Sequence, residues 1–432
     1  MGKSPDKLLL KADKLNKALQ YKRAAKVYGS AGDSYLSLDN YRLARDCFYN
    51  AAICANNEEK YKISLKFLRN AGNASLIAFD FSDAYQIFRK SLEYVSSLSN
   101  ASDRNHNYIL FSSLSYLCLF LEGKQEEGLN IVKKYRSNVD NTYFKDHPLV
   151  HCITNLTFAI KEKSDKYLKR IERDFDTLKL KEGEIILAKN VLVLAESNIS
   201  LINRLSFDKD IYTTNDTINL ILEVDTNPLK EISNNKFYSF TIEELEISKI
   251  SITLSDNLTS QKNSELPILL KPGKIHKTDL FIKPHFQMEN SYVGPILLSC
   301  KLNGNLIFYH EISQVLKPNL ISPLPSLDIS LDTLRTPLID TTFPLEVLIE
   351  NKSEGEALDL KVNIEFPEQI KVMRGTLEKQ IYSLRTNENI KWEINVKPIE
   401  AGDYIIKVNT KFNDPDQNII EDNKEFPLSI KL

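Results

Sequence analysis

The residues with the clearest potential for chemistry are two histidines and a cysteine within six positions. His147 and His151 stand four residues apart and Cys152 follows directly, a spacing that could hold a zinc ion on one helix. The only acidic neighbour is Asp146. Pro148 suits the first turn of a helix and His147 its cap, which explains the segment without an ion. We therefore expect no metal site here.

Other sequence patterns of catalytic and nucleotide-binding sites are missing. The 13 glycines are dispersed, and no G-x-x-x-x-G-K or G-x-G-x-x-G phosphate-binding loop occurs. There is neither a G-x-S-x-G nucleophile motif nor an H-E-x-x-H zinc motif. The dense charge run from 161 to 181 mixes both signs, which indicates pairing within a helix rather than a nucleic-acid-binding stripe. We therefore expect a protein that is not an enzyme, uses no cofactor and binds no nucleic acid.

A stronger pattern is an aromatic residue every 20 positions, at Tyr21, Tyr41, Tyr61 and Phe81. Each opens a run in which small and large apolar residues recur at offsets of 3, 7 and 10, for example Ala44, Phe48 and Ala51. These offsets fall on one face of an α-helix. Small residues opposite aromatic ones let neighbouring helices approach closely. A helix every 20 residues, and so a helix pair every 40, is typical of an α-solenoid.

Apolar periodicity predicts helices throughout this part of the chain. They are expected near residues 5–18, 21–37, 41–55, 60–76 and 81–98 and, after a polar break from Asn100 to Asn107, near 108–121, 125–136, 147–162, 164–178 and 183–203. Proline marks where this pattern ends, because only two of the 16 prolines precede residue 227 and proline is excluded from helix interiors. We therefore assign residues 1–205 to an α-solenoid of helical hairpins.

The remainder of the chain has the alternating pattern of strands. Residues 206–316 and 327–432 each predict an antiparallel immunoglobulin-like β-sandwich. Asn303 and Gly304 predict a tight hairpin turn in the first, and Trp392 is expected in the core of the second. Three prolines between them make residues 317–326 a stiff linker. The predicted fold class is multidomain α + β, with the solenoid followed by the two sandwiches.

Composition and charge indicate the compartment of the protein and the kind of partner that it binds. No run of about 18 apolar residues predicts a membrane span, which leaves peripheral membrane association open. The N-terminus lacks the apolar stretch of a signal peptide, and five scattered cysteines indicate buried thiols in a reducing compartment. We expect a cytoplasmic protein. Residues 1–205 hold 32 Lys and Arg against 24 Asp and Glu, while the remainder holds 24 against 34. This asymmetry favours an acidic partner for the helical half, although solvated helix lysines are an alternative explanation.

The helical half resembles the tetratricopeptide superfamily, whose second-helix signature is similar to Ala84, Phe88 and Ser91. Its uniform spacing, with Ala-Gly pairs at 31–32 and 71–72, is similar to the soluble attachment proteins (the SNAP family), which couple SNARE complexes to a disassembly ATPase. The match covers about residues 6–100. It implies that basic residues on the solenoid grip an acidic helical bundle, and the residues here that could do so are Lys22, Arg23, Lys26, Arg42 and Arg45. After residue 205 the chain departs from that family, so ATPase coupling is not carried over.

The last domain resembles immunoglobulin-like modules through Trp392-Glu393-Ile394 and the later Gly402-Asp403-Tyr404. The order solenoid, sandwich, sandwich is similar to that of trafficking tethers and coat appendages. We therefore expect a non-enzymatic scaffold or adaptor that binds an acidic helical or peptide partner, in an assembly of the membrane-trafficking kind. One alternative is an exported surface- or glycan-binding protein whose sandwiches are the binding modules. Another is a regulatory subunit of an enzyme complex.

Overall fold

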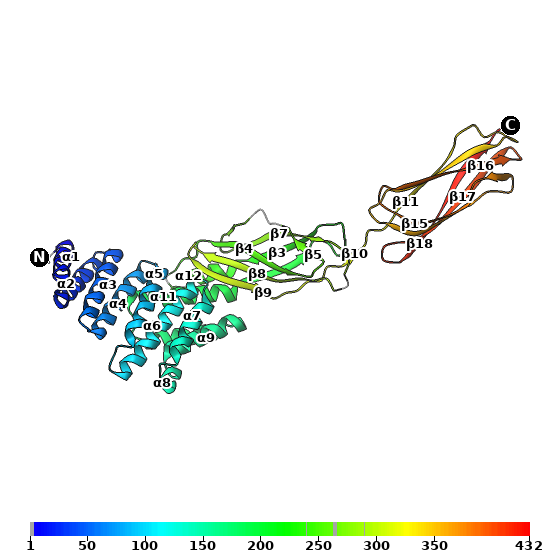
Figure 1. Ribbon diagram of the computed structural model, residues 1–432. Helices are drawn as coiled ribbons and strands as arrows, with labels where there is room; N and C mark the ends of the chain where they lie inside the picture. The colour runs from blue at the N-terminus through cyan, green and yellow to red at the C-terminus, as the bar shows by residue number, and fades with distance from the viewer. Residues whose placement is uncertain (1–3, 239, 262–265, 289) are drawn as a thin grey trace.

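The computed structural model describes residues 4–238, 240–261, 266–288 and 290–432. Helices fill the N-terminal half and antiparallel sheets follow, which confirms the predicted α + β fold class. Figure 1 shows the helices stacked in series, a first pair of sheets against the last helices, and a second pair of sheets beyond a narrow connection.

The helices of the N-terminal half are α1 (Pro5–Lys17), α2 (Tyr21–Leu36), α3 (Tyr41–Asn57), α4 (Tyr61–Ile77), α5 (Phe81–Val95), α6 (Ala101–Leu121), α7 (Gln125–Arg136), α8 (Asn141–Lys145), α9 (Pro148–Glu162), α10 (Leu168–Thr177) and α11 (Glu182–Ser200). Most predicted bounds agree within a few residues. The polar break expected from Asn100 to Asn107 is wrong, because α6 already begins at Ala101. The Asn100 side chain accepts a hydrogen bond from the backbone N–H of Asp103 at 3.0 Å, so the polar stretch caps and starts a helix.

The turns between the first five helices explain the 20-residue spacing. Leu19, Asp39, Glu59 and Phe79 occupy the same turn position, each in the left-handed region with φ between 56° and 59°. Each turn reverses the chain, so that consecutive helices pack as antiparallel neighbours. Glycine makes room for the next helix. A Cβ on Gly72 would lie 2.3 Å from the Phe88 ring, and one on Gly32 would lie 2.7 Å from the Phe48 ring. The Ala-Gly pairs are therefore sites of close helix contact.

The strands of the first sandwich region are β1 (Ile202–Phe207), β2 (Tyr212–Thr213), β3 (Ile218–Asp225), β4 (Leu245–Leu254), β5 (Leu258–Ser260), β6 (Ile268–Leu270), β7 (Ile275–Pro284), β8 (Val293–Leu302), β9 (Leu306–Ile312) and β10 (Leu320–Ile321). The orders β1-β3-β7-β5 and β6-β4-β8-β9 form its two main sheets. A short helix, α12 (Asn227–Asn234), interrupts the strands and was not predicted. Asn303 and Gly304 have φ values of 47° and 75°, which confirms the predicted tight turn between β8 and β9.

The second sandwich region contains β11 (Leu327–Thr333), β12 (Phe343–Asn351), β13 (Ala357–Glu365), β14 (Ile370–Arg374), β15 (Glu378–Leu384), β16 (Asn389–Pro398), β17 (Gly402–Asn413) and β18 (Ile419–Ile430). Its sheets have the orders β11-β12-β16-β14 and β15-β13-β17-β18, around a separate apolar core. Trp392, expected inside this core, is half-buried against it, and its indole N–H donates to the Thr376 carbonyl at 3.1 Å.

The two sandwiches differ in how they are attached. One apolar core runs without interruption from the stacked helices into the first sandwich. The edge strand β9 lies against α6 and α11, and the Lys163 ammonium donates to the Glu311 carbonyl at 2.8 Å. The segment before the second sandwich was predicted as a linker, and within it β10 pairs in parallel with β2. Across this connection, the Asn215 side-chain amide donates to Glu354 at 3.0 Å.

His310 on β9 is the buried polar centre of the junction between the helices and the first sandwich. Its Nδ1 lies 2.9 Å from the carbonyl oxygen of Asn198, and its Nε2 lies 2.7 Å from the side-chain nitrogen of Asn203. Burial and the nearby Lys163 ammonium lower the pKa of His310 to about 4, and the contact with Asn198 opposes this shift. The imidazole is therefore held neutral at physiological pH.

This burial predicts a loss of stability in mild acid. As pH falls from about 6.5 to about 4, the unfolded chain binds a proton at His310 and the folded chain does not, so the free energy of unfolding falls. The loss attributable to His310 is about 3 kcal/mol at most. Urea unfolding at several pH values should show a weaker acid dependence in His310→Gln, whereas the exposed control His285→Gln should behave as the wild type. His147, whose pKa burial also lowers to about 4, and His106, whose pKa burial lowers as well, contribute to the dependence that remains. An unchanged pH profile in His310→Gln would contradict the assignment.

Candidate functional site: surfaces for partner binding

The histidine segment proposed as a possible metal ligand set acts as a helix cap. The Nδ1 atom of His147 accepts a hydrogen bond from the backbone N–H of Leu149 at 3.2 Å, at the start of α9. The Nε2 atom of His151 instead lies 2.7 Å from the Lys145 carbonyl oxygen. Among the described residues, no group of three or more His, Cys, Asp and Glu side chains could hold a metal ion. The interpretation of His147 as a cap is confirmed.

The cysteines are buried and unpaired, as predicted. Burial raises the pKa of the Cys47 and Cys300 thiols to about 12, so both remain protonated at neutral pH. A thiol in that state is a poor nucleophile and a poor metal ligand. The cysteines therefore act as small apolar core residues.

Four lysines form a row across two neighbouring helices, which we call the lysine row: Lys22 and Lys26 on α2, and Lys62 and Lys66 on α4. All four are exposed, and the two pairs are related by the 40-residue period. The two helices touch, because the Gly29 backbone of α2 lies against the Phe67 ring of α4. Lys62 forms a salt bridge with Asp103 at 2.9 Å. Within the described part of the chain, the other three lysines have no salt bridge.

The remaining basic residues predicted as partner contacts lie elsewhere. Arg23 is exposed on α2 and donates to Gln20 at 2.8 Å. Arg42 is exposed near the start of α3, at the opposite end of the α2–α3 pair from Lys22 because the two helices are antiparallel. Arg45 forms salt bridges with Asp46 at 2.7 Å and Asp83 at 2.9 Å. The structure therefore places Lys22 and Lys26 together with Lys66, and it places Arg42 and Arg45 in a second location.

Helix α11 lies against α4 and α6. A buried ion pair fixes it there. The Arg69 guanidinium of α4 donates from two nitrogens to the two carboxylate oxygens of Glu184, both at 2.6 Å. The Glu184 side chain is fully buried and also accepts from the Lys181 backbone N–H at 2.9 Å. At Gly183 a Cβ would lie 2.4 Å from the Asn73 carbonyl oxygen, so only glycine fits.

The start of α11 brings a further positive charge to the lysine row. The pKa of Lys181 is lowered by burial and by the nearby Arg69 and Lys66 charges, and Glu184 and Asp33 oppose this effect. Sequence reasoning missed Lys66 and Lys181. The 40-residue period applied to Lys26 could have found Lys66, whereas Lys181 reaches this surface only through the packing of α11.

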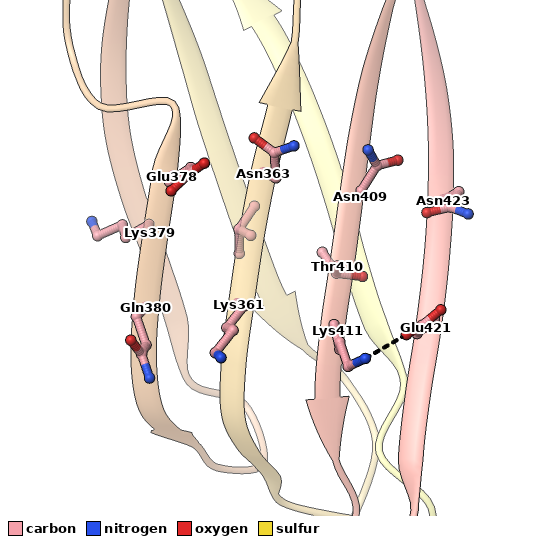
Figure 2. Close-up of a pocket in the computed structure, with 11 residues that line it drawn as sticks. Lys361, Asn363, Glu378, Lys379, Gln380, Asn409, Thr410, Lys411, Glu421 and Asn423 are labelled. Carbon is pink, nitrogen blue, oxygen red and sulfur yellow. Dashed lines mark hydrogen bonds and ion pairs between the residues drawn. The ribbon is translucent and has the colours of Figure 1, made fainter.

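A second candidate surface is the outer face of the sheet β15-β13-β17-β18, where a polar trough of about 770 Å³ crosses the strands (Figure 2). In register, one row of the trough runs through Glu378, Asn363, Asn409 and Asn423, and the next through Gln380, Lys361, Lys411 and Glu421. Lys411 pairs with Glu421 at 2.7 Å, and the Asn409 side-chain amide donates to Glu365 at 2.9 Å. This surface offers amide and charged groups for hydrogen bonding. Such a polar face is also what a solvated antiparallel sheet presents.

Comparison with protein-family models and with curated proteins yields no match to this chain. Within the described residues, no helix is both long enough and apolar enough to cross a membrane.

Removing one member of the Arg69–Glu184 pair should destabilise the fold more than removing both members. Arg69→Leu leaves a buried carboxylate without its partner and should lower the free energy of unfolding by about 3–5 kcal/mol. The double variant Arg69→Leu, Glu184→Leu should recover most of this loss, because neither charge is then buried alone. Urea unfolding followed by circular dichroism measures both. As a control, Lys169→Leu removes the exposed pair with Asp165 and should change stability little. Equal stability of Arg69→Leu and the wild type would show that this pair does not hold α11.

Proposed function

We propose that this chain is a non-enzymatic scaffold or adaptor whose helical part binds an acidic helical or peptide segment of another protein. The observation that carries the proposal is the lysine row. Lys22, Lys26 and Lys66 stand exposed on adjacent helices, without salt bridges among the described residues. Asp33 on α2 offsets part of the charge of Lys66, and the remaining positive charge on this face raises the potential there and attracts an oppositely charged partner. Stacked helices also present the extended surfaces that such partners use.

The resemblance of residues 6–100 to the tetratricopeptide superfamily and to the SNAP family supports the same proposal. It suggests a cytoplasmic role in an assembly of the membrane-trafficking kind, in which the two sandwiches extend the surface or recruit a second component. Arg23 lies beside the lysine row in sequence and belongs to the proposed contact. Arg42 and Arg45 are a second set of contacts, and Arg45 would have to exchange Asp46 and Asp83 for the partner.

Reversing the charge of the lysine row tests this proposal. The tagged chain and the variant Lys22→Glu, Lys26→Glu, Lys66→Glu are purified from the native cells, and the proteins bound to each are identified by mass spectrometry. Proteins with acidic helical or extended segments should bind the wild type, bind less as salt rises, and be lost from the variant. The control variant Lys133→Glu, Lys134→Glu, Lys145→Glu changes charge equally at exposed sites on α7 and α8. Recovery of the same partners by all three chains would refute the proposal.

A second candidate function is glycan binding by the second sandwich, and the asparagine row of the trough favours it. Asparagine is a poor strand residue, yet Asn363, Asn409 and Asn423 lie side by side on three strands. Amide groups both donate and accept hydrogen bonds, which suits the hydroxyl groups of a sugar. Tyr382, 85% exposed and two residues beyond Gln380 on β15, offers an aromatic surface next to the trough.

Glycan binding and simple solvation of the sheet predict different effects of Asn409→Thr. Threonine is the better strand residue, so stability should stay equal or rise. If the trough binds a sugar, the wild-type chain should retain specific oligosaccharides on a glycan array and the variant should bind them at least about tenfold more weakly, the effect of losing roughly one buried hydrogen bond. No retained oligosaccharide, or equal retention by the variant, would reject glycan binding at this site.

A further inference from the structure

An apolar groove runs along the exposed face of α11. It consists of two hollows of about 380 and 270 Å³ that share Ile185 and Lys189 as a dividing ridge, and we call it the α11 groove. The larger hollow is lined by Phe79 from the α4–α5 turn and by Tyr238 and Phe240. The smaller hollow is lined by residues that include Phe175, Leu178 and Phe237.

The apolar side chains of the α11 groove are unusually exposed for their size. Phe79 is 49% exposed, Ile185 44% and Phe237 40%. Phe79 occupies the left-handed turn position that Asp39 and Glu59 fill with solvated side chains in the two preceding turns. Two exposed aromatic rings thus flank one face of α11, and a hollow lies on each side of the ridge. Such a site can receive the anchoring side chains of a partner.

Basic residues lie on the ridge of the groove and at the end of the groove nearest Lys181. Lys189 stands on the ridge with its ammonium 5.3 Å from the centre of the Phe237 ring, and Lys179 lines the smaller hollow. The segment that carries Leu178 and Lys179 continues directly into Lys181, which adjoins the lysine row at Lys66. The groove is therefore continuous with the basic surface. Asp176 and Glu182 are the acidic residues in its lining.

We infer that the α11 groove is the anchoring site for a segment of another protein that carries two apolar side chains followed by acidic residues. One apolar side chain enters each hollow on either side of Ile185, and the acidic residues extend over Lys181 and Lys66 toward Lys26. Lys181, Lys66 and Lys26 select acidic residues at one end of the segment, and the paired hollows select the spacing of its two apolar side chains. This inference rests on the proposed function and adds to it the position and the hydrophobic part of the contact.

The groove and the lysine row make separable contributions to binding. Burial of anchoring side chains depends little on ionic strength, whereas contacts to exposed lysines weaken as salt screens them. A variant of the groove should therefore lose affinity at every salt concentration. A variant of the lysine row should lose affinity mostly at low salt.

The test uses a display library of random 16-residue peptides selected on the whole chain, followed by fluorescence anisotropy with the enriched peptides. Enriched peptides should combine two apolar residues with an acidic run. Ile185→Asp should weaken their binding about 30-fold, the loss typical of an anchoring residue, and Phe237→Ala should weaken it as well. Ile53→Asp, at a site on α3 with 40% exposure, is the matched control and should bind as the wild type. Thermal unfolding of each variant checks that the fold is intact.

The outcomes separate this inference from the proposed function. If reversal of the lysine row weakens binding and Ile185→Asp and Phe237→Ala do not, the scaffold proposal stands and the groove assignment is overturned. If no acidic peptide is enriched, both fall. Self-association of the whole chain in analytical ultracentrifugation that Ile185→Asp abolishes would identify a second copy as the occupant, and it would also overturn the assignment to a separate partner.

Discussion

The position of α11 on the helical half depends on one charge pair between residues 115 positions apart, Arg69 and Glu184, in which the Glu184 carboxylate is fully buried. Glu184 could not be buried alone, because an isolated carboxylate strongly prefers water to the protein interior. The guanidinium fork of Arg69 satisfies both carboxylate oxygens, and the Lys181 N–H adds a third hydrogen bond. Since these partners have directional geometry, α11 has one favourable position on α4.

The position of α11 then determines what surrounds it. Its N-terminus brings Lys181 beside Lys66, and its outer face places Ile185 and Lys189 between the two hollows. Its C-terminal end carries Asn198 to His310 on β9, where the helices join the first sandwich. A single helix therefore connects the basic surface, the apolar groove and the rigid junction. The second sandwich has a core of its own, so its polar trough does not depend on α11.

The sequence could predict those helices and strands whose residue pattern is contained within one short stretch of the chain. The 20-residue aromatic spacing, the apolar periodicity and the distribution of proline were sufficient for most of the helices and for the change to strands, although the short helix α8 was not predicted. The first turns of α6 were missed because Ala101 to Asn107 carry polar side chains on an exposed helix end, where no apolar period exists. Helix α12 was missed because eight residues give too few turns to establish a period.

The candidate surfaces were harder to predict because they combine distant segments. Lys22 and Lys26 are visible in the sequence as an i, i+4 pair, but Lys181 joins them only through tertiary packing. The asparagine row similarly depends on strand register, which brings Asn363 beside Asn409, 46 positions later, and Asn409 beside Asn423. Charge composition pointed to the helical half for a basic surface and could not indicate which lysines lack salt bridges.

A buried ion pair contributes little net stability, because the cost of removing two charges from water offsets most of their attraction. Its advantage in this fold is specificity of position. A groove that is to accept two anchoring side chains needs its ridge fixed to within a fraction of a side chain, and the backbone contact at Gly183 and the ion pair at Glu184 provide this at the end of α11 nearest the groove. The polar contacts that look unfavourable for stability are thus the ones that define the shape of the proposed binding surface.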